Sequence, residues 1–239
     1  MKAHFASLIP ALALAPAFLI GPLPAVAQSP VAVPAPAMQK GISIELATTK
    51  NAVPMPDADT QDSLIVTVSA DGSVYLGVDP IRPAALAEKV RDRLSSREQQ
   101  LYIKADARAP YANVGKVLDA VRAAGVEAAA LLTAQPEPSQ PGTVVPPNGL
   151  EVLIASPSGS QSTVVQVLSS GQQWPMLKIN NDQIPWLAPQ STLRQLFQNR
   201  SERVVLVKAD GRLPFAAVVN VIDICRSAGA TVVLAASGQ

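Results

Sequence analysis

The chain has few of the side chains that most enzymes use for chemistry. Among its 239 residues there is one cysteine, Cys225, so no disulfide can form within the chain. The one histidine is His4, at the start of a segment with targeting character. The rest of the chain therefore lacks the histidine needed for Ser-His-Asp or Cys-His catalysis and for histidine-ligated metal sites. We expect no enzyme, no cofactor and no metal site.

Charged and aromatic residues are also scarce. Charged residues make up 15% and aromatic residues 4%, and the 19 basic and 18 acidic residues leave a formal charge of +1. Such a balance gives no broad attraction for nucleic acid or an anionic membrane surface. Hydrophobic residues, at 48%, suffice for packed cores and exclude global disorder.

The N-terminus has the pattern of an export signal. Lys2 precedes an uncharged stretch that runs from Phe5 to Gln39, and residues 25–27 read Ala-Val-Ala. This pattern predicts a signal peptide over residues 1–27. The alternative is an N-terminal membrane anchor, although four prolines would interrupt a spanning helix. Both interpretations predict export, with the rest of the chain delivered across a membrane.

Two proline-rich segments divide the remainder. Residues 28–40 and 135–148 are rich in proline and small residues, which is typical of tethers and linkers. They separate two expected domains of similar length, residues 41–134 and 149–239.

The two expected domains repeat one sequence. Lys104-Ala-Asp-Ala-Arg-Ala-Pro-Tyr111 matches Lys208-Ala-Asp-Gly-Arg-Leu-Pro-Phe215 at an offset of 104 residues. The same offset continues without a gap as far as Gly125 and Gly229. A duplicated domain explains this constant register.

Hydrophobic periodicity predicts the elements of each copy. In copy one we expect strands over residues 42–46, 63–69, 73–76, 101–103 and 126–132, and helices over 83–94 and 110–124. In copy two we expect strands near 150–155, 163–168, 176–179, 204–207 and 231–235, and helices near 192–198 and 214–228. Each copy is thus predicted as a β-β-β-α-β-α-β unit of an α+β fold, with two helices on one face of a mixed sheet.

Three positions in these helices carry specific expectations. Gly125 and Gly229 are expected to end their helices in the left-handed conformation. Cys225 corresponds to Val121 on the apolar helix face, so we expect a buried, unreactive thiol.

The repeated motif resembles a known family. Lys104-Ala-Asp106, Pro110-Tyr111 and a helix ending in Ala124-Gly125-Val126 are similar to the periplasmic domain of the ExbD/TolR biopolymer-transport proteins. The hairpin signal Asp71-Gly72 fits the same pattern.

This resemblance implies a role in protein transport driven by the proton-motive force. It implies an ExbB/TolQ-type membrane partner, a TonB/TolA-type partner, and contact with peptidoglycan as in TolR-type relatives. It also implies that the exported domains are periplasmic, either free or anchored at the inner membrane. Family members carry an essential aspartate in a transmembrane helix, whereas this sequence has no acidic residue before Glu45. We therefore expect an accessory component; the alternative is a periplasmic binding module for peptidoglycan or an envelope protein, without a motor role.

Two groups of residues are candidates for partner binding. The first lies in the repeated motif and comprises Asp106, Arg108, Tyr111, Asp210, Arg212 and Phe215. The alternative for its polar members is a loop in which Asp caps the next helix or turn while Arg is solvated. The second group is Trp174 and Trp186, which occur only in copy two. Tryptophan suits a binding hot spot and the edge of a core equally well.

The duplication also predicts the assembly. Family domains typically work as pairs of separate chains, and a covalent repeat replaces such a pair by raising the effective concentration of the second copy. We expect a monomer whose two copies meet about an approximate two-fold axis. The alternative is two independent domains on a tether.

Overall fold

The computed structural model describes residues 42–95, 100–135, 146–154, 163–172, 174–186, 188–198 and 200–235. All of them belong to one compact unit, and its helices and mixed sheet confirm the predicted α+β class. Copy one contains β1 (Val53–Pro54), the 3-10 helix η1 (Pro56–Asp59), β2 (Leu64–Val68), β3 (Val74–Leu76), β4 (Asp79–Pro80), α1 (Pro83–Ser95), β5 (Leu101–Ala105), α2 (Tyr111–Ala123) and β6 (Ala128–Thr133). Copy two contains β7 (Asn148–Leu153), β8 (Thr163–Leu168), β9 (Met176–Ile179), β10 (Asp182–Ile184), α3 (Pro189–Phe197), β11 (Val204–Ala209), α4 (Phe215–Ser227) and β12 (Thr231–Leu234).

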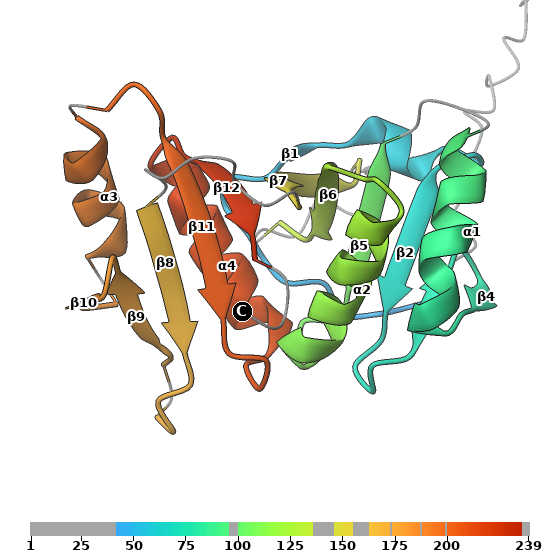
Figure 1. Ribbon diagram of the computed structural model, residues 1–239, viewed down its shortest axis with the longest axis horizontal. Helices are drawn as coiled ribbons and strands as arrows, with labels where there is room; N and C mark the ends of the chain where they lie inside the picture. Colours follow the sequence, from blue (N-terminus) through green and yellow to red (C-terminus); the bar gives the residue numbers. More distant parts are fainter. Residues whose placement is uncertain are drawn as a thin grey trace, which may run out of the picture. The chain divides into compact units, whose positions relative to one another are not determined.

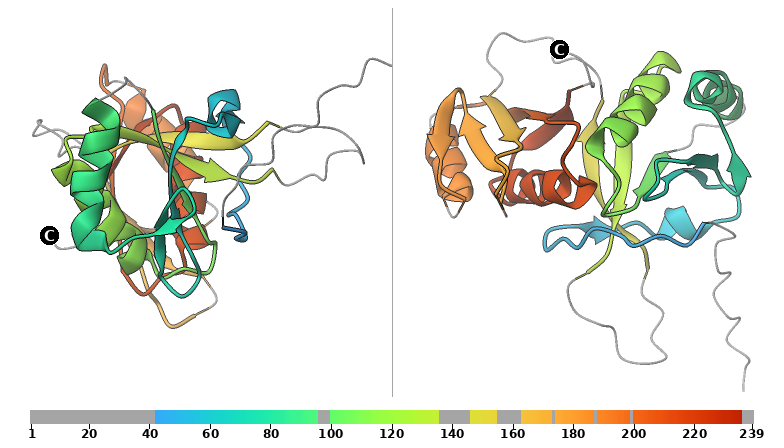
Figure 2. Two further views of the ribbon diagram at one scale, coloured as in Figure 1. Left: turned by 90° about the vertical axis from the view of Figure 1, so that its right-hand side faces the viewer. Right: turned by 90° about the horizontal axis from the view of Figure 1, so that it is seen from below.

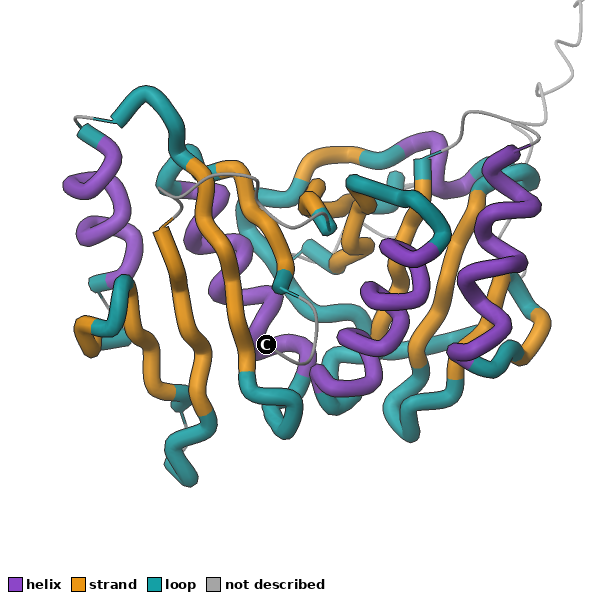
Figure 3. Tube along the Cα trace, viewed as in Figure 1, coloured by secondary structure: helices purple, strands orange, loops and turns teal. Residues whose placement is uncertain are grey.

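The strands of both copies join in one mixed sheet. Its order is β10-β9-β8-β11-β12-β7-β6-β5-β2-β3-β4, and β1 pairs with β7 beside this path. Within each copy the central strands are parallel and the outer hairpin is antiparallel. Figure 1 shows the two halves of the sheet, with copy one in blue to green and copy two in yellow to red, and Figure 3 shows the same view with the strands in orange and the helices in purple. The duplication therefore extends to the strand order, which is the same in both halves.

Strand β7 is shared between the copies. It pairs antiparallel with β6 along its whole length, and Leu153 pairs in parallel with Val233 of β12. The first strand of copy two thus closes the gap between the last strands of both copies.

The shared position of β7 explains one wrong prediction. The strand expected over Ile42–Leu46 is absent, and Leu46 makes only an isolated bridge with Asp106. Strand β5 is already flanked by β2 and β6, and β7 occupies the other edge of β6. The edge of β6 is therefore not available to the leading segment of copy one, although the alternating sequence of that segment suits a strand.

The helices bury the apolar faces that the sequence predicts. Figure 2 shows α1 and α2 together on one side of the copy-one strands. Their apolar side chains form one contiguous core together with those of α3, α4 and the strands of copy two. The fully buried helical side chains include Leu86, Val90, Val114, Val117, Leu118, Val121, Leu193, Phe215, Val218 and Ile222.

The opposite face of the copy-one strands is covered by the short 3-10 helix η1 and the extended segment before it, not by α-helices. Met55 and Ala58, in and beside η1, pack on Ile65, Tyr102 and the last strand of the copy. In the right-hand view of Figure 2 this segment, in blue, lies on the side of the sheet away from α1 and α2. Copy one is therefore a three-layer structure over these strands.

The expected helix ends are confirmed. Gly125 and Gly229 have φ values of +91° and +81° and follow α2 and α4. A β-carbon on Gly125 would meet no atom within 4 Å, so the requirement for glycine is purely one of backbone conformation.

Gly125→Ala is therefore expected to lower the free energy of unfolding by about 1 kcal/mol, because alanine disfavours positive φ. Gly125→Asn is the matched control, and its loss is expected to be smaller because asparagine tolerates this conformation better. Urea denaturation measures both. A stabilising effect of alanine would contradict the assignment of the left-handed cap.

Candidate functional site

The repeated motif forms the contact between the two copies. The N–H of Tyr111 donates to the carbonyl of Leu213 at 2.8 Å, and the N–H of Phe215 donates to the carbonyl of Ala109 at 2.8 Å. Tyr111 and Phe215 are equivalent in the repeat, as are Ala109 and Leu213. Exchanging the copies thus reproduces the same pair of bonds, which defines a local two-fold relation.

A second symmetric pair of bonds lies on either side of the first. Ala112 N–H donates to Gly211 O and Ala216 N–H donates to Ala107 O, each at 2.9 Å. Between them Pro110 and its equivalent Pro214 form an antiparallel bridge. We call the paired loops, residues 106–112 and 210–216, the junction.

The junction provides hydrogen-bond acceptors for the N-terminal N–H groups of α2 and α4. The first N–H groups of an α-helix have no partner inside that helix. Tyr111 and Ala112 open α2, Phe215 and Ala216 open α4, and neither helix has a side-chain cap bond at its N-terminus. Each helix instead donates its first N–H groups to the loop of the other copy. The second helix of each copy is therefore capped by its duplicate.

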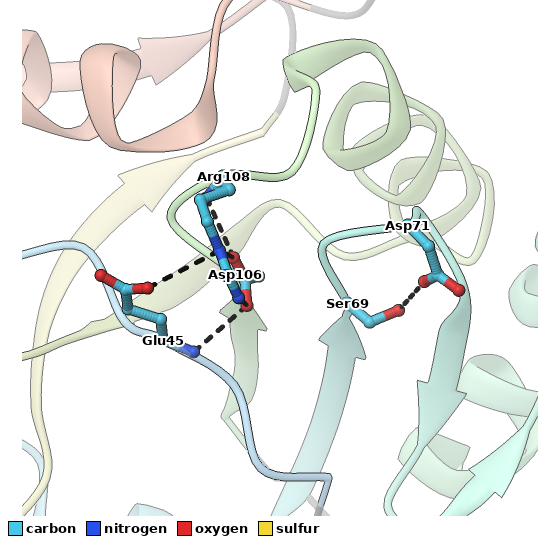
Figure 4. A network of polar contacts seen from close by, with 5 residues as sticks. All are labelled: Glu45, Ser69, Asp71, Asp106 and Arg108. Atoms are coloured by element: carbon cyan, nitrogen blue, oxygen red, sulfur yellow. Dashed lines mark hydrogen bonds and ion pairs between the residues drawn. The ribbon is translucent and has the colours of Figure 1, made fainter.

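Asp106 fixes the shape of the first junction loop. Its carboxylate accepts the backbone N–H of Arg108 at 3.0 Å, and accepts Nε and Nη2 of the same residue at 2.9 and 3.0 Å. It also accepts the N–H of Glu45 at 3.2 Å (Figure 4). Asp106 is 2% exposed, whereas the Arg108 side chain is 66% exposed. The aspartate caps the turn and presents the guanidinium to solvent.

Asp210 repeats this arrangement in copy two. It accepts the backbone N–H of Arg212 at 3.0 Å and its Nη2 at 2.8 Å. The Arg212 side chain is more exposed than that of Arg108. Hydrogen bonds from these arginine side chains hold the pKa of both aspartates at about 2. Both loops have the form of an Asp-capped turn, and each Arg bonds to its Asp while most of its side chain is exposed to solvent.

The depressed pKa of Asp106 predicts a loss of stability in acid. The folded-state pKa of about 2 lies below the ordinary value of 3.8, so the ionised carboxylate favours folding. This stabilisation is complete above about pH 4 and lost as the pH falls towards 2. Allowing for the exposed guanidinium, we expect about 1–2 kcal/mol. Denaturation of Asp106→Asn at several pH values is expected to show a flatter profile in this window; a profile as steep as that of the unchanged chain would contradict the assignment.

The aromatic residues of the motif face the core. Tyr111 is 2% exposed and Phe215 is fully buried, while their main-chain N–H groups bond to the other copy. Burial raises the pKa of Tyr111 to about 12. Among the described residues the Tyr111 hydroxyl has no hydrogen-bond partner. The tyrosine therefore buries a polar group that its equivalent, Phe215, does not have.

Tyr111→Phe is accordingly expected to raise the free energy of unfolding by about 1 kcal/mol, because it removes an unpaired buried hydroxyl and restores the residue of copy two. The reciprocal change, Phe215→Tyr, is expected to cost about 1–3 kcal/mol. Thermal denaturation of both variants tests the pair. Destabilisation by Tyr111→Phe would show that the hydroxyl has a favourable contact.

Trp174 and Trp186, which are not part of the repeated motif, lie next to each other. Their ring centroids are 5.5 Å apart with planes tilted by 32°. Trp174 is 56% exposed, whereas Trp186 is half-buried against the core. Trp174 precedes β9 and Trp186 follows β10, so the β9–β10 hairpin places them opposite each other. Trp186 thus lies at the edge of the core, and Trp174 lies beside it as an exposed aromatic ring.

Comparison with known proteins identifies the family. The family model "Biopolymer transport protein ExbD/TolR" matches the chain twice, over residues 29–136 and 134–238. The chain belongs to the ExbD/TolR family. The two matches fall on the two copies defined by the repeat, which confirms the predicted tandem resemblance.

Curated ExbD proteins match at modest identity. The biopolymer transport proteins ExbD of Neisseria gonorrhoeae and of Neisseria meningitidis serogroup B are each 31% identical over 96 residues. The match covers 38% of this chain and 66% of either relative. The chain thus spans just under two thirds of the length of these ExbD proteins.

No helix within the described ranges is both long and apolar enough to cross a membrane. The residues expected as a signal peptide or anchor, 1–27, and most of the expected linker, 136–145, lie outside the described residues.

Sequence reasoning missed two residues at or near the junction. Glu45 donates its N–H to Asp106, and its carboxylate lies 3.6 Å from Arg108. Asp223 binds the leading segment of copy one from α4. The 104-residue offset pairs Asp223 with Asp119. The sequence around Asp223 does not indicate that its carboxylate binds Asn51, 172 residues earlier in the chain.

Proposed function

We propose that the protein is a non-enzymatic, accessory component of an ExbD/TolR-type biopolymer transport system linked to the proton-motive force, with both copies in the periplasm. Family membership supports a place in such a system. The accessory role follows from the sequence before Glu45, which contains no acidic residue to serve as the family's membrane aspartate. An ionisable group inside a membrane is costly and is kept where it does work.

The observation that carries this proposal is the junction. Each copy caps the second helix of the other through two main-chain bonds, which makes four bonds in all. A pair of family domains is thereby built within one chain, and we expect this pair to act as a single unit towards an ExbB/TolQ-type membrane protein or a TonB/TolA-type protein. The chain is expected to be monomeric in solution, because the surface that would pair two chains is already used internally.

Copurification tests the transport role. A tagged full-length chain, isolated from gently solubilised membranes, is expected to retain an ExbB/TolQ-type channel protein. N-terminal sequencing of the same material distinguishes export with cleavage after Ala27 from an anchor that keeps Met1. Absence of a channel-type partner in a preparation that is folded and correctly exported would overturn the proposal.

A specific observation favours the second candidate, a periplasmic binding module. Trp174 is an exposed aromatic ring that lies at a tilt against the half-buried ring of Trp186, which suits a binding hot spot. Sedimentation with purified peptidoglycan tests this role. Binding that is lost in Trp174→Ala but kept in Val78→Ala, a control of similar exposure in copy one, would support it. Equal sedimentation of both variants would exclude a role for the tryptophan.

A further inference from the structure

The leading segment of copy one crosses the boundary between the copies. Residues 45–58, here called the strap, begin beside Asp106, pass Ala134 at the end of β6 and reach β7. Thr49 donates its N–H to Ala134 O at 3.0 Å, and Met55 donates its N–H to Pro147 O. In Figure 2 the strap is the blue chain that runs along the sheet towards α4. It is bound at both ends by copy one and by the start of copy two.

Asp223 binds the middle of the strap from copy two. It lies on α4 and is 7% exposed. One carboxylate oxygen accepts the N–H of Lys50 and the other accepts the N–H of Asn51, both at 2.9 Å. A buried carboxylate bonded to two main-chain N–H groups is a strong and specific contact, because charge-assisted bonds exceed neutral ones.

The equivalent position in copy one does not make this contact. Asp119 is more exposed and pairs with Arg122 of its own helix at 3.5 Å. The fold of a single copy therefore does not require the bonds that Asp223 makes. They belong to the relation between the strap and copy two.

The strap covers an apolar surface. Met55 and Ala58 are 6% and 0% exposed, and they lie on Ile65, Tyr102 and the β6 residues Ala130 and Leu132. Gly149 makes room for this packing, since a β-carbon there would lie 3.1 Å from the Met55 side chain and 3.0 Å from a main-chain oxygen. Displacing the strap would expose this cluster, whereas the main core would lose only Ala47 and the partly buried Ala52.

We propose that Asp223 is a latch that holds the strap closed, and that releasing it opens the strap and bares the apolar cluster of Ile65, Tyr102, Ala130 and Leu132. The segment that precedes residue 42 is continuous with the strap, so a pull from the N-terminal side acts on these bonds in order. The bonds at Glu45 and Thr49 break before those at Lys50 and Asn51. Asp223 is then the last contact before β1, and it links the leading segment to copy two.

Hydrogen exchange of the purified full chain tests the latch, and it needs no transport partner, so it is independent of the proposed function. In Asp223→Asn one carboxylate oxygen becomes an NH2 group, which cannot accept an N–H. We expect strap amides, residues 49–55, to exchange at least about tenfold faster, with β8 and β11 unchanged. Peroxide is expected to oxidise Met55 correspondingly faster, while oxidation of Met176 stays the same. Asp119→Asn is the matched control and is expected to change neither.

Two results would overturn the latch. One is strap exchange in Asp223→Asn equal to that of the unchanged chain. The other is a uniform loss of protection across copy two, which would make Asp223 a general stabilising residue of α4.

A crosslink keeps the test valid if Asp223→Asn does not fold. The hydroxyl oxygens of Thr49 and Thr133 are 2.8 Å apart, so cysteines at these positions are close enough to bond. In a Cys225→Val background, oxidation of Thr49→Cys with Thr133→Cys is expected to slow strap exchange and Met55 oxidation at least about tenfold relative to the reduced form. Equal rates in the two forms would show that the strap does not open separately.

Discussion

Cys225→Asp is expected to unfold copy two. The Cys225 side chain is fully buried in α4, and burial raises the pKa of its thiol to about 12. A carboxylate there would lie in the apolar core without a partner. We expect a loss of about 4 kcal/mol or more, a large part of the 5–15 kcal/mol that stabilises a typical domain. Both tryptophans lie in copy two, so their fluorescence reports this loss directly.

Cys225→Val is the matched control. It restores the residue that stands at the equivalent position 121 and keeps an apolar side chain of similar size, so the expected change is below about 1 kcal/mol. A native fluorescence spectrum for Cys225→Asp at neutral pH would contradict the buried position of this thiol.

Gly211→Leu is expected to separate the junction. A β-carbon at Gly211 would lie 2.9 Å from the Ala112 side chain and 3.4 Å from its α-carbon. A leucine needs more room still, and it acts where Ala112 donates its N–H to the other copy. Loss of the junction bonds together with overpacking is expected to cost about 3 kcal/mol. Circular dichroism reports the unfolding of both copies, whereas tryptophan fluorescence reports that of copy two. The two signals are therefore expected to give different midpoints in urea.

Ala107→Gly provides the control for this change. Residue 107 is the copy-one equivalent of Gly211, so glycine restores the residue of the duplicate, and the expected loss stays below about 1 kcal/mol. Coincident transitions for Gly211→Leu, at the midpoint of the unchanged chain, would show that the junction adds nothing to stability.

Most of the correct fold predictions were based on the sequence repeat. The 104-residue offset predicted α2 and α4, the glycines that end them and the burial of Cys225. It did so because each position in one copy could be compared with its equivalent in the other. The strands β8 and β9 match the expected ranges at both ends. Local periodicity was sufficient at these elements because each is buried on one face by its own copy.

Predictions failed where the two copies compete for one position. Residues 42–46 have the alternation of a strand, but β7 occupies the sheet edge that they would need. Local pattern cannot decide which of two equivalent segments takes a shared edge. The pairing of β6 with β7 depends on contacts between the copies, which spacing within one copy does not contain.

A turn signal for the tryptophan pair was present and was overlooked. Asn180 and Asn181 have positive φ values of 50° and 77°, the conformation of a tight hairpin turn that asparagine tolerates. Reading Asn-Asn as such a turn predicts the β9–β10 hairpin and brings Trp174 opposite Trp186. The role of the motif residues was harder to foresee, since aspartate and arginine suit a partner surface and a capped turn alike.

The bonds across the junction run between main-chain atoms, and this has a consequence for how the copies can change. A main-chain donor or acceptor persists whatever side chain is substituted, provided that the loop keeps its course. The equivalent positions 107 and 211, or 111 and 215, already carry different residues without altering the pattern of bonds. The side chains on the surfaces of the two copies can therefore diverge in evolution, as the tryptophans found only in copy two illustrate. The main-chain bonds that join the copies are kept.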